Sequence, residues 1–95
     1  MVKRIVVLGA GISGVGAAVL AKKKGFEVFI SDKGKITEDN KKVLLNNDID
    51  WEENNHTFDK ILNADEVIKS PGIPDSFELI QKLKNAKIPL ISEVE

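Results

Sequence analysis

The chain has no cysteine, no tyrosine, one tryptophan and one histidine among its 95 residues. The lack of cysteine excludes disulfide bridges and thiolate metal sites, and it fits a reducing compartment. Fourteen basic and fifteen acidic side chains give a net charge of -1, so no broad positive field attracts nucleic acid. The one histidine, His56, has no second histidine or cysteine nearby, which predicts an exposed side chain without a catalytic or metal-binding role.

Long apolar runs are also missing. The stretch from Ile5 to Ala21 superficially resembles a secretory signal, but glycines interrupt it and it is shorter than the roughly 20 residues that span a bilayer. Three lysines at positions 22–24 close it, as at the C-terminus of a helix. We therefore expect a cytoplasmic protein that does not contact a membrane.

The residues that are abundant are those of a small folded domain. Apolar residues make up 42% of the chain and charged residues 31%, enough to form a core and to cover it. This length suits one compact unit, so we expect residues 1–95 to form a single domain.

Short β-branched segments alternate with helical patterns along the whole chain. Strands are expected at 4–8, 27–31, 49–52, 66–69 and 88–92. Helices are expected at 12–24, 37–45 and 58–62, with a last one capped by Asp75 or Ser76 and facing the sheet through Phe77, Ile80 and Leu83. This alternation predicts an α/β fold: a Rossmann-like, five-stranded parallel sheet in the order 3-2-1-4-5, flanked by helices.

A glycine motif joins the first strand to the first helix. Gly9, Gly11 and Gly14 follow the pattern G-x-G-x-x-G, in which the glycines allow a tight turn, the approach of a phosphate and close helix packing. The amides around Ile12 and Ser13 would then point at an anion at the start of the helix. The alternative is that these glycines serve only helix-to-sheet packing.

Two further features lie beyond the ends of predicted strands. Asp32 follows the second strand, where it would accept a hydrogen bond from a ribose hydroxyl or a base N–H, unless it is only a solvated turn residue. Ser70, Pro71 and Gly72 follow the fourth strand and form a rigid turn at the same crevice, with a hydroxyl and an amide available to a ligand. The alternative for this turn is a simple connection from strand to helix.

Together these motifs resemble the Mur ligases of peptidoglycan synthesis, in particular the branch that adds D-glutamate. The likeness extends over essentially all of the chain and is carried by "VVLGAGISG", "ISD", "ADEVIKSPGIP" and "AKIPLISEVE". The turn Ser-Pro-Gly-Ile-Pro is the most specific of these marks. In that family the N-terminal Rossmann-like domain holds the UDP part of a muramyl substrate instead of NAD.

The resemblance assigns roles to the candidate residues. It implies that the amides of Ile12 and Ser13 hold the pyrophosphate and that Asp32 and Lys33 face the uracil. The implied UDP-binding set is Gly9, Gly11, Ile12, Ser13, Gly14, Asp32, Lys33, Ser70, Pro71 and Gly72.

The resemblance also implies a larger enzyme. Its substrate would be UDP-N-acetylmuramoyl-L-alanine, and ATP and Mg²⁺ would bind in a central domain outside this chain, because no G-x-x-x-x-G-K-[ST] loop occurs here. We expect this chain to bind substrate without catalytic or metal-binding residues, and to work with central and C-terminal domains that it lacks. The glycines and Asp32 alone would equally suit an NAD(P)- or FAD-binding oxidoreductase domain, and a nucleotide-sensing domain is a third alternative.

Overall fold

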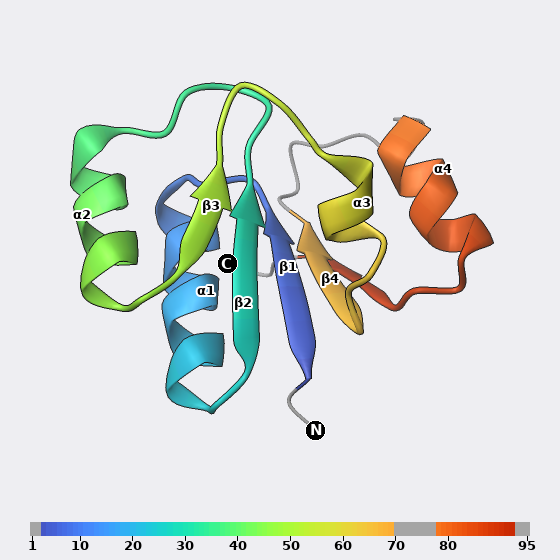
Figure 1. Cartoon of the computed structure of the whole chain (residues 1–95), viewed down its shortest axis with the longest axis horizontal. Coiled ribbons are helices and arrows are strands. Elements are labelled where there is room, and N and C mark those ends of the chain that lie inside the picture. The colour runs from blue at the N-terminus through green and yellow to red at the C-terminus, as the bar shows by residue number, and fades with distance from the viewer. Residues whose placement is uncertain (1–2, 70–77, 93–95) are drawn as a thin grey trace.

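The computed structural model describes residues 3–69 and 78–92 of the chain. Helices and strands alternate, and the five strands form one parallel sheet in the order β3-β2-β1-β4-β5, as the sequence predicts (Figure 1). The strands are β1 (Arg4–Leu8), β2 (Glu27–Ser31), β3 (Asp50–Glu52), β4 (Glu66–Lys69) and β5 (Leu90–Ser92). The helices are α1 (Ile12–Lys23), α2 (Glu38–Asn46), α3 (Phe58–Ile61) and α4 (Glu78–Asn85).

Each face of the sheet has its own hydrophobic core, because alternate side chains of a strand point to opposite faces. From β1, Ile5 and Val7 join the cluster that packs against α1 and α2, whereas Val6 and Leu8 join the cluster that packs against α3 and α4. Figure 1 shows α1 and α2 together on one side of the sheet and α3 and α4 on the other. The crossover helices thereby leave the carboxyl ends of the strands along one common edge.

Local signals in the sequence place the ends of most elements correctly. Gly25 follows α1 with φ +92°, the left-handed conformation that favours glycine after a helix. Thr37 caps α2 by accepting a hydrogen bond from the Asn40 amide at 3.3 Å. In α4, Ile80 and Leu83 are fully buried as expected, whereas the predicted cap at Asp75 or Ser76 and the side chain of Phe77 lie outside the described residues.

Two strands begin later than the apolar pattern predicts. The Ile49 amide donates to the Leu44 carbonyl at 2.9 Å, and the Ile88 amide donates to the Leu83 carbonyl at 3.1 Å. Both residues therefore complete the turn after a helix, and their apolar side chains pack into the core without belonging to the sheet. Pairing starts at Asp50 in β3 and at Leu90 in β5.

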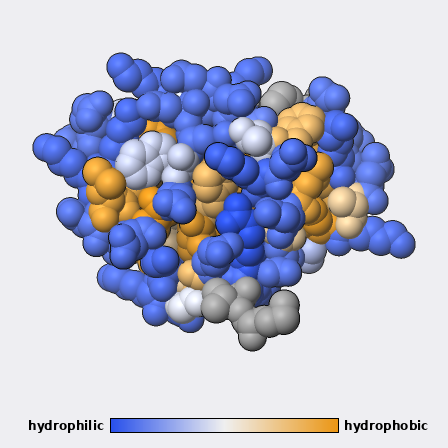
Figure 2. Space-filling model, in the orientation of Figure 1, coloured by the Kyte–Doolittle hydropathy of each residue, from blue (hydrophilic) through white to orange (hydrophobic). Residues whose placement is uncertain are grey.

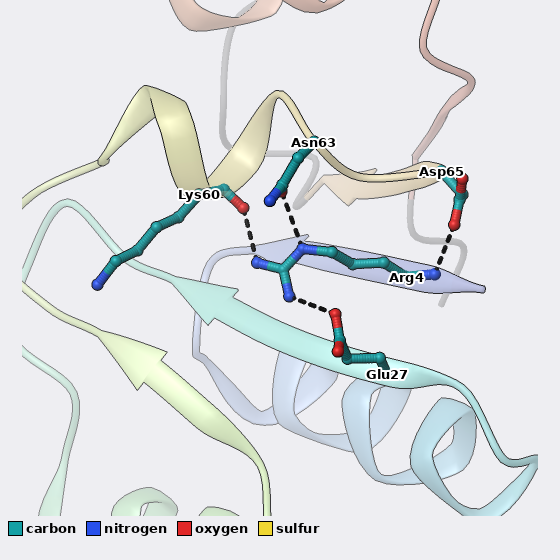
Figure 3. Close-up of polar contacts among 5 residues, drawn as sticks. All are labelled: Arg4, Glu27, Lys60, Asn63 and Asp65. Atoms are coloured by element: carbon teal, nitrogen blue, oxygen red, sulfur yellow. Dashed lines mark hydrogen bonds and ion pairs between the residues drawn. The ribbon is translucent and has the colours of Figure 1, made fainter. Parts of the chain in front are cut away.

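Arg4 organises the opposite edge, at the amino ends of the strands. All three of its guanidinium nitrogens donate hydrogen bonds, to Asn63 Oδ1 at 2.9 Å, Glu27 Oε2 at 2.8 Å and the Lys60 carbonyl at 2.8 Å (Figure 3). Its backbone amide donates to Asp65 Oδ2 at 2.7 Å. This one side chain thus links β1 to β2, α3 and the turn before β4.

The outer surface is mainly hydrophilic on the face shown in Figure 2, with separate apolar patches. An open hollow of about 560 Å³ lies beside β2 and β3, and α2 and α3 also contribute to its lining. It is lined by Arg4, Phe29, Leu45, Asp50, Trp51 and Lys60. Among the described residues, no helix is both long enough and apolar enough to cross a membrane.

Candidate nucleotide-binding site

The glycine loop leaves β1 in a conformation that glycine favours. Gly9 has φ +105°, and its amide donates to the Ser31 carbonyl at 2.9 Å, so the loop is fixed to the end of β2. Gly11 is the N-cap of α1, and a Cβ atom added there would meet nothing within 4 Å. Packing among residues 3–69 and 78–92 therefore does not require glycine at position 11, and the space beside it would allow the close approach of a ligand.

The N-terminus of α1 presents amides at this space. The Val15 amide donates to the Gly11 carbonyl at 2.9 Å, which is the first hydrogen bond of the helix, so the amides of Ile12, Ser13 and Gly14 have no acceptor within α1. The first turn contains no acidic residue, and the last turn contains Lys22 and Lys23. The partial positive charge at this terminus therefore remains available to an anion.

Asp32 holds the glycine loop in place. Its Oδ2 accepts a hydrogen bond from the Ala10 amide at 2.8 Å, and its Oδ1 accepts one from the Gly34 amide at 2.8 Å. A solvated turn residue would explain only the second contact. An ionised carboxylate has about four acceptor positions, so these two bonds leave room for the predicted hydrogen bond to a ligand, which stays a prediction.

Asn40 also holds the glycine loop, a contact that the sequence did not indicate. Its side-chain Nδ2 donates to the Ala10 carbonyl at 2.9 Å, so both backbone groups of Ala10 are held by side chains from other elements. Asn40 also supplies the amide that Thr37 caps. A polar residue in the first turn of a helix is ordinarily solvent-facing, which is why its position in the sequence gave no sign of this contact.

The turn after β2 is bound on its far side by the loop that follows β3. The Asp32 amide donates to the Glu52 carbonyl at 3.0 Å, and the Asn55 amide donates to the Asp32 carbonyl at 3.3 Å. The Asn54 amide donates to the Gly34 carbonyl at 2.9 Å. The backbone that carries Asp32 and Lys33 therefore runs between the glycine loop and residues 52–57.

Glu53 ties the same loop to α2. It accepts a hydrogen bond from the Ile36 amide at 2.9 Å and forms an ion pair with Lys41 at 2.7 Å. The Lys41 bond and the Ile36 bond lower the pKa of Glu53, and the Glu53 bond raises the pKa of Lys41. Both groups thus keep their charges at neutral pH.

A polar network built on Ser31 lies beneath this turn. The fully buried Ser31 places its Oγ 2.8 Å from Glu52 Oε2 and 2.6 Å from His56 Nδ1. Glu52 also accepts hydrogen bonds from the Thr57 amide at 2.8 Å and the Thr57 hydroxyl at 2.5 Å. The expectation of an exposed His56 is wrong, because the histidine is half-buried over this network.

The charges of the network assign its protons. Burial alone would raise the pKa of Glu52, but the hydrogen bonds from Thr57 and Ser31 and the charge of Lys60 lower it. Glu52 is therefore ionised and can only accept, like the Asn55 carbonyl 3.2 Å from Ser31 Oγ. The Ser31 hydroxyl thus donates toward these two oxygens, and the Ser31 oxygen accepts from His56 Nδ1–H. Burial lowers the pKa of His56, opposed by the carboxylates of Glu52 and Asp32 and assisted by Lys33, which leaves the ring neutral at pH 7.

The structure brings most of the predicted residues to one edge. The backbone of Gly9, Gly11, Ile12, Ser13 and Gly14 and the turn of Asp32 and Lys33 adjoin one another at the carboxyl ends of β1 and β2. Ser70, Pro71 and Gly72 lie outside the described residues.

A buried lysine next to that undescribed segment was missed. Lys69 is only 7% exposed, and it pairs with Leu8 at the carboxyl end of β4. The only sign of this burial in the sequence is that Lys69 ends the predicted strand "EVIK". Within residues 3–69 and 78–92, no group of three or more His, Cys, Asp or Glu residues is arranged to hold a metal ion.

Known proteins match the chain over almost its whole length. Bacteroides thetaiotaomicron has a protein named UDP-N-acetylmuramoylalanine--D-glutamate ligase that is 61% identical over 93 residues, covering 98% of this chain and 21% of that protein. A protein of the same name from Christiangramia forsetii is 55% identical over 95 residues, covering 100% of this chain and 21% of that protein. The chain thus spans about a fifth of the length of these curated relatives.

A solved structure supports the same relationship. A pseudomurein peptide ligase type C from Methanothermus fervidus superposes with a TM-score of 0.81 at 32% identity, covering 95% of this chain and 19% of that one. A family model described as MurD N-terminal domain matches residues 4–79, which is most of the chain and includes the glycine loop and the Asp32 turn. The chain therefore belongs to the MurD N-terminal domain family.

Proposed function

We propose that this chain binds the UDP portion of UDP-N-acetylmuramoyl-L-alanine, as the N-terminal domain of a cytoplasmic ligase that adds D-glutamate to this substrate in peptidoglycan synthesis. The observation that carries the proposal is the N-terminus of α1. Its first three amides have no acceptor within the helix, and the space beside Gly11 is open. The family to which the chain belongs, and the names of its relatives, support the choice of this ligand.

The site suits a diphosphate joined to a uridine. The diphosphate would accept hydrogen bonds from the amides of Ile12 and Ser13 at the positive end of the helix dipole. Uracil offers an N–H to the remaining acceptor positions of Asp32 and a carbonyl to Lys33. Ser70, Pro71 and Gly72, which lie outside the described residues, remain predicted contacts of the ligand.

The residues of this chain bind and orient the substrate. In the whole ligase, ATP and Mg²⁺ would activate the L-alanyl carboxylate for attack by D-glutamate, a step that we assign to the central and C-terminal domains. In this proposal the chain contributes no catalytic group. Its task is to fix one end of a long substrate so that the carboxylate at the other end reaches those domains.

The sharpest test deletes one amide and changes little else. Gly11 has ψ −173°, the extended conformation required before proline, and Ile12 is the first residue of α1, where proline is well tolerated. Ile12→Pro should therefore fold and lose one hydrogen bond to the diphosphate, which lowers affinity about tenfold. Calorimetric titration with UDP-N-acetylmuramoyl-L-alanine measures this, and Ile12→Ala, which keeps the amide, is the matched control.

The same titration separates the proposal from its main alternative. Binding of the UDP ligand by the wild-type chain, with no binding of NAD or FAD at the same concentrations, is the expected result. Saturation by NAD without response to the UDP ligand would contradict the proposal. Equal affinities for Ile12→Pro and Ile12→Ala would place the diphosphate elsewhere.

A further inference from the structure

We propose that Glu52, Ser31 and His56 are positioning residues for the UDP site. They hold the Asp32 turn in the position from which the Asp32 carboxylate binds the Ala10 amide of the glycine loop. None of the three belongs to the set of residues predicted to touch the ligand. The inference rests on the proposed function for the identity of the ligand, but the positioning itself rests on contacts within the chain.

The first step is the continuity of the contacts. Glu52 binds Ser31 Oγ through its carboxylate at 2.8 Å and the Asp32 amide through its backbone carbonyl at 3.0 Å. Asp32 binds the Ala10 amide at 2.8 Å, and Ala10 precedes the N-cap of α1. A displacement of Glu52 is therefore transmitted through two hydrogen-bonded contacts to the amides that would hold the diphosphate.

The second step is the cost of disturbing the network. Ser31 is fully buried, and its hydroxyl contacts the Glu52 carboxylate, the Asn55 carbonyl and the His56 ring. Glu52 accepts three hydrogen bonds, from Ser31 and from the amide and hydroxyl of Thr57. Leaving a polar group of a buried network unsatisfied is costly, so these hydrogen bonds favour one arrangement of Ser31, Glu52 and Thr57.

The third step excludes a simpler reading. If the turn after β2 were rigid without Glu52 and His56, these residues would contribute to the stability of the fold but not to ligand affinity. The turn, however, contacts the glycine loop through the Asp32 side chain on one side and residues 52–55 through backbone hydrogen bonds on the other. The loop after β3 is thus the second support of the Asp32 turn, and Glu52 fastens that loop at both Ser31 and Thr57.

Glu52→Gln tests the inference in the 95-residue chain. Glutamine keeps the shape of the side chain but removes its negative charge and turns one acceptor into a donor facing the hydroxyl of Ser31 or Thr57, so the bonds that hold the network are no longer charge-assisted. We expect affinity for UDP-N-acetylmuramoyl-L-alanine to fall about tenfold, as for one charged hydrogen bond. We also expect the Ala10 amide proton to move upfield in ¹H–¹⁵N spectra, because that resonance reports its bond to Asp32.

Glu27→Gln is the matched control, since it makes the same chemical change at the first residue of β2, at the opposite edge of the sheet from Glu52. The inference is overturned if Glu52→Gln lowers only the melting temperature and leaves affinity and the Ala10 resonance as in the wild type. If Glu52→Gln does not fold, Ser31→Ala is judged by the same two readouts. If the wild-type chain does not bind the UDP ligand, the proposed function fails, and the Ala10 resonance alone still decides the positioning.

Discussion

The two edges of the sheet differ in how their polar groups are paired. At the amino edge, Arg4 directs all three guanidinium nitrogens at acceptors within the chain (Figure 3). At the carboxyl edge, Asp32 also serves two partners, but the amides at the start of α1, which it helps to place, have no acceptor within the helix. The comparison shows what marks the candidate site: backbone amides that are held in place but have no acceptor within their helix. Charge alone does not distinguish the two edges.

Removing the carboxylate of Asp32 should have the largest effect and should affect both properties. Asp32→Ala leaves the Ala10 and Gly34 amides without their acceptor, which costs roughly 2 to 4 kcal/mol of unfolding free energy for two charge-assisted bonds. It should also lower affinity for UDP-N-acetylmuramoyl-L-alanine more than tenfold, since the glycine loop loses its anchor. Urea unfolding and calorimetry measure the two effects; a stable variant with unchanged affinity would refute the role of Asp32.

Removing the guanidinium of Arg4 should affect stability only. Arg4→Met keeps an apolar stem over the Phe29 ring, above which the guanidinium now lies at 5.4 Å, and loses the bonds to Asn63 and the Lys60 carbonyl. We expect unfolding free energy to fall by about 2 kcal/mol, with ligand affinity unchanged.

Glu27→Gln is the control for the Arg4 variant. It removes the exposed ion pair alone and should cost less than about 0.5 kcal/mol. A loss of UDP affinity in Arg4→Met would break the division between the two edges.

We expect a smaller effect of pH on the free energy of unfolding, through His56. Burial lowers the pKa of His56 below its ordinary value of about 6.5, so the unfolded chain takes up a proton more readily than the folded one. Stability should be unaffected by His56 well above pH 6.5 and should decrease as pH falls through that value. Unfolding followed between pH 8 and pH 5 should show this slope in the wild type and lose it in His56→Asn. An identical slope in both proteins would exclude His56 as its source.

At still lower pH, Glu52 acts in the same direction. Its pKa is lowered below the ordinary value of 4.5, so the stability it contributes is present above that value and is lost as pH falls through the folded pKa. Glu52→Gln should reduce this acid sensitivity, which the same unfolding series measures.

The sequence predicted the strands and the glycine loop because those signals are local, and the sheet order followed from the alternation of strands and helices. A β-branched run that ends in glycine, followed by a small-residue helix, reports its own structure, and Thr37 and Gly25 mark helix ends through their own chemistry. The late starts of β3 and β5 were not predictable, because the apolar side chains of Ile49 and Ile88 suit a helix-closing turn as well as a strand.

The supports of the site were not predictable for a different reason. Asn40, Glu52 and His56 are polar residues in polar surroundings of the sequence, and their contacts with Ala10 and Ser31 join residues 21 to 30 positions apart. Only the fold brings them together. The expectation that His56 is exposed was wrong because it rested on the polar residues next to His56 in the sequence. In the fold, the ring contacts Ser31 at the end of β2.

The most direct test of the account is a map of ligand-induced shifts in ¹H–¹⁵N spectra of the chain. On addition of UDP-N-acetylmuramoyl-L-alanine, the account predicts the largest shifts at the amides of Ile12, Ser13 and Gly14, with smaller ones around Asp32. The amides around Arg4 and in the hollow beside Trp51 should not move. Shifts concentrated at Arg4 or Trp51, with the start of α1 unchanged, would contradict the account.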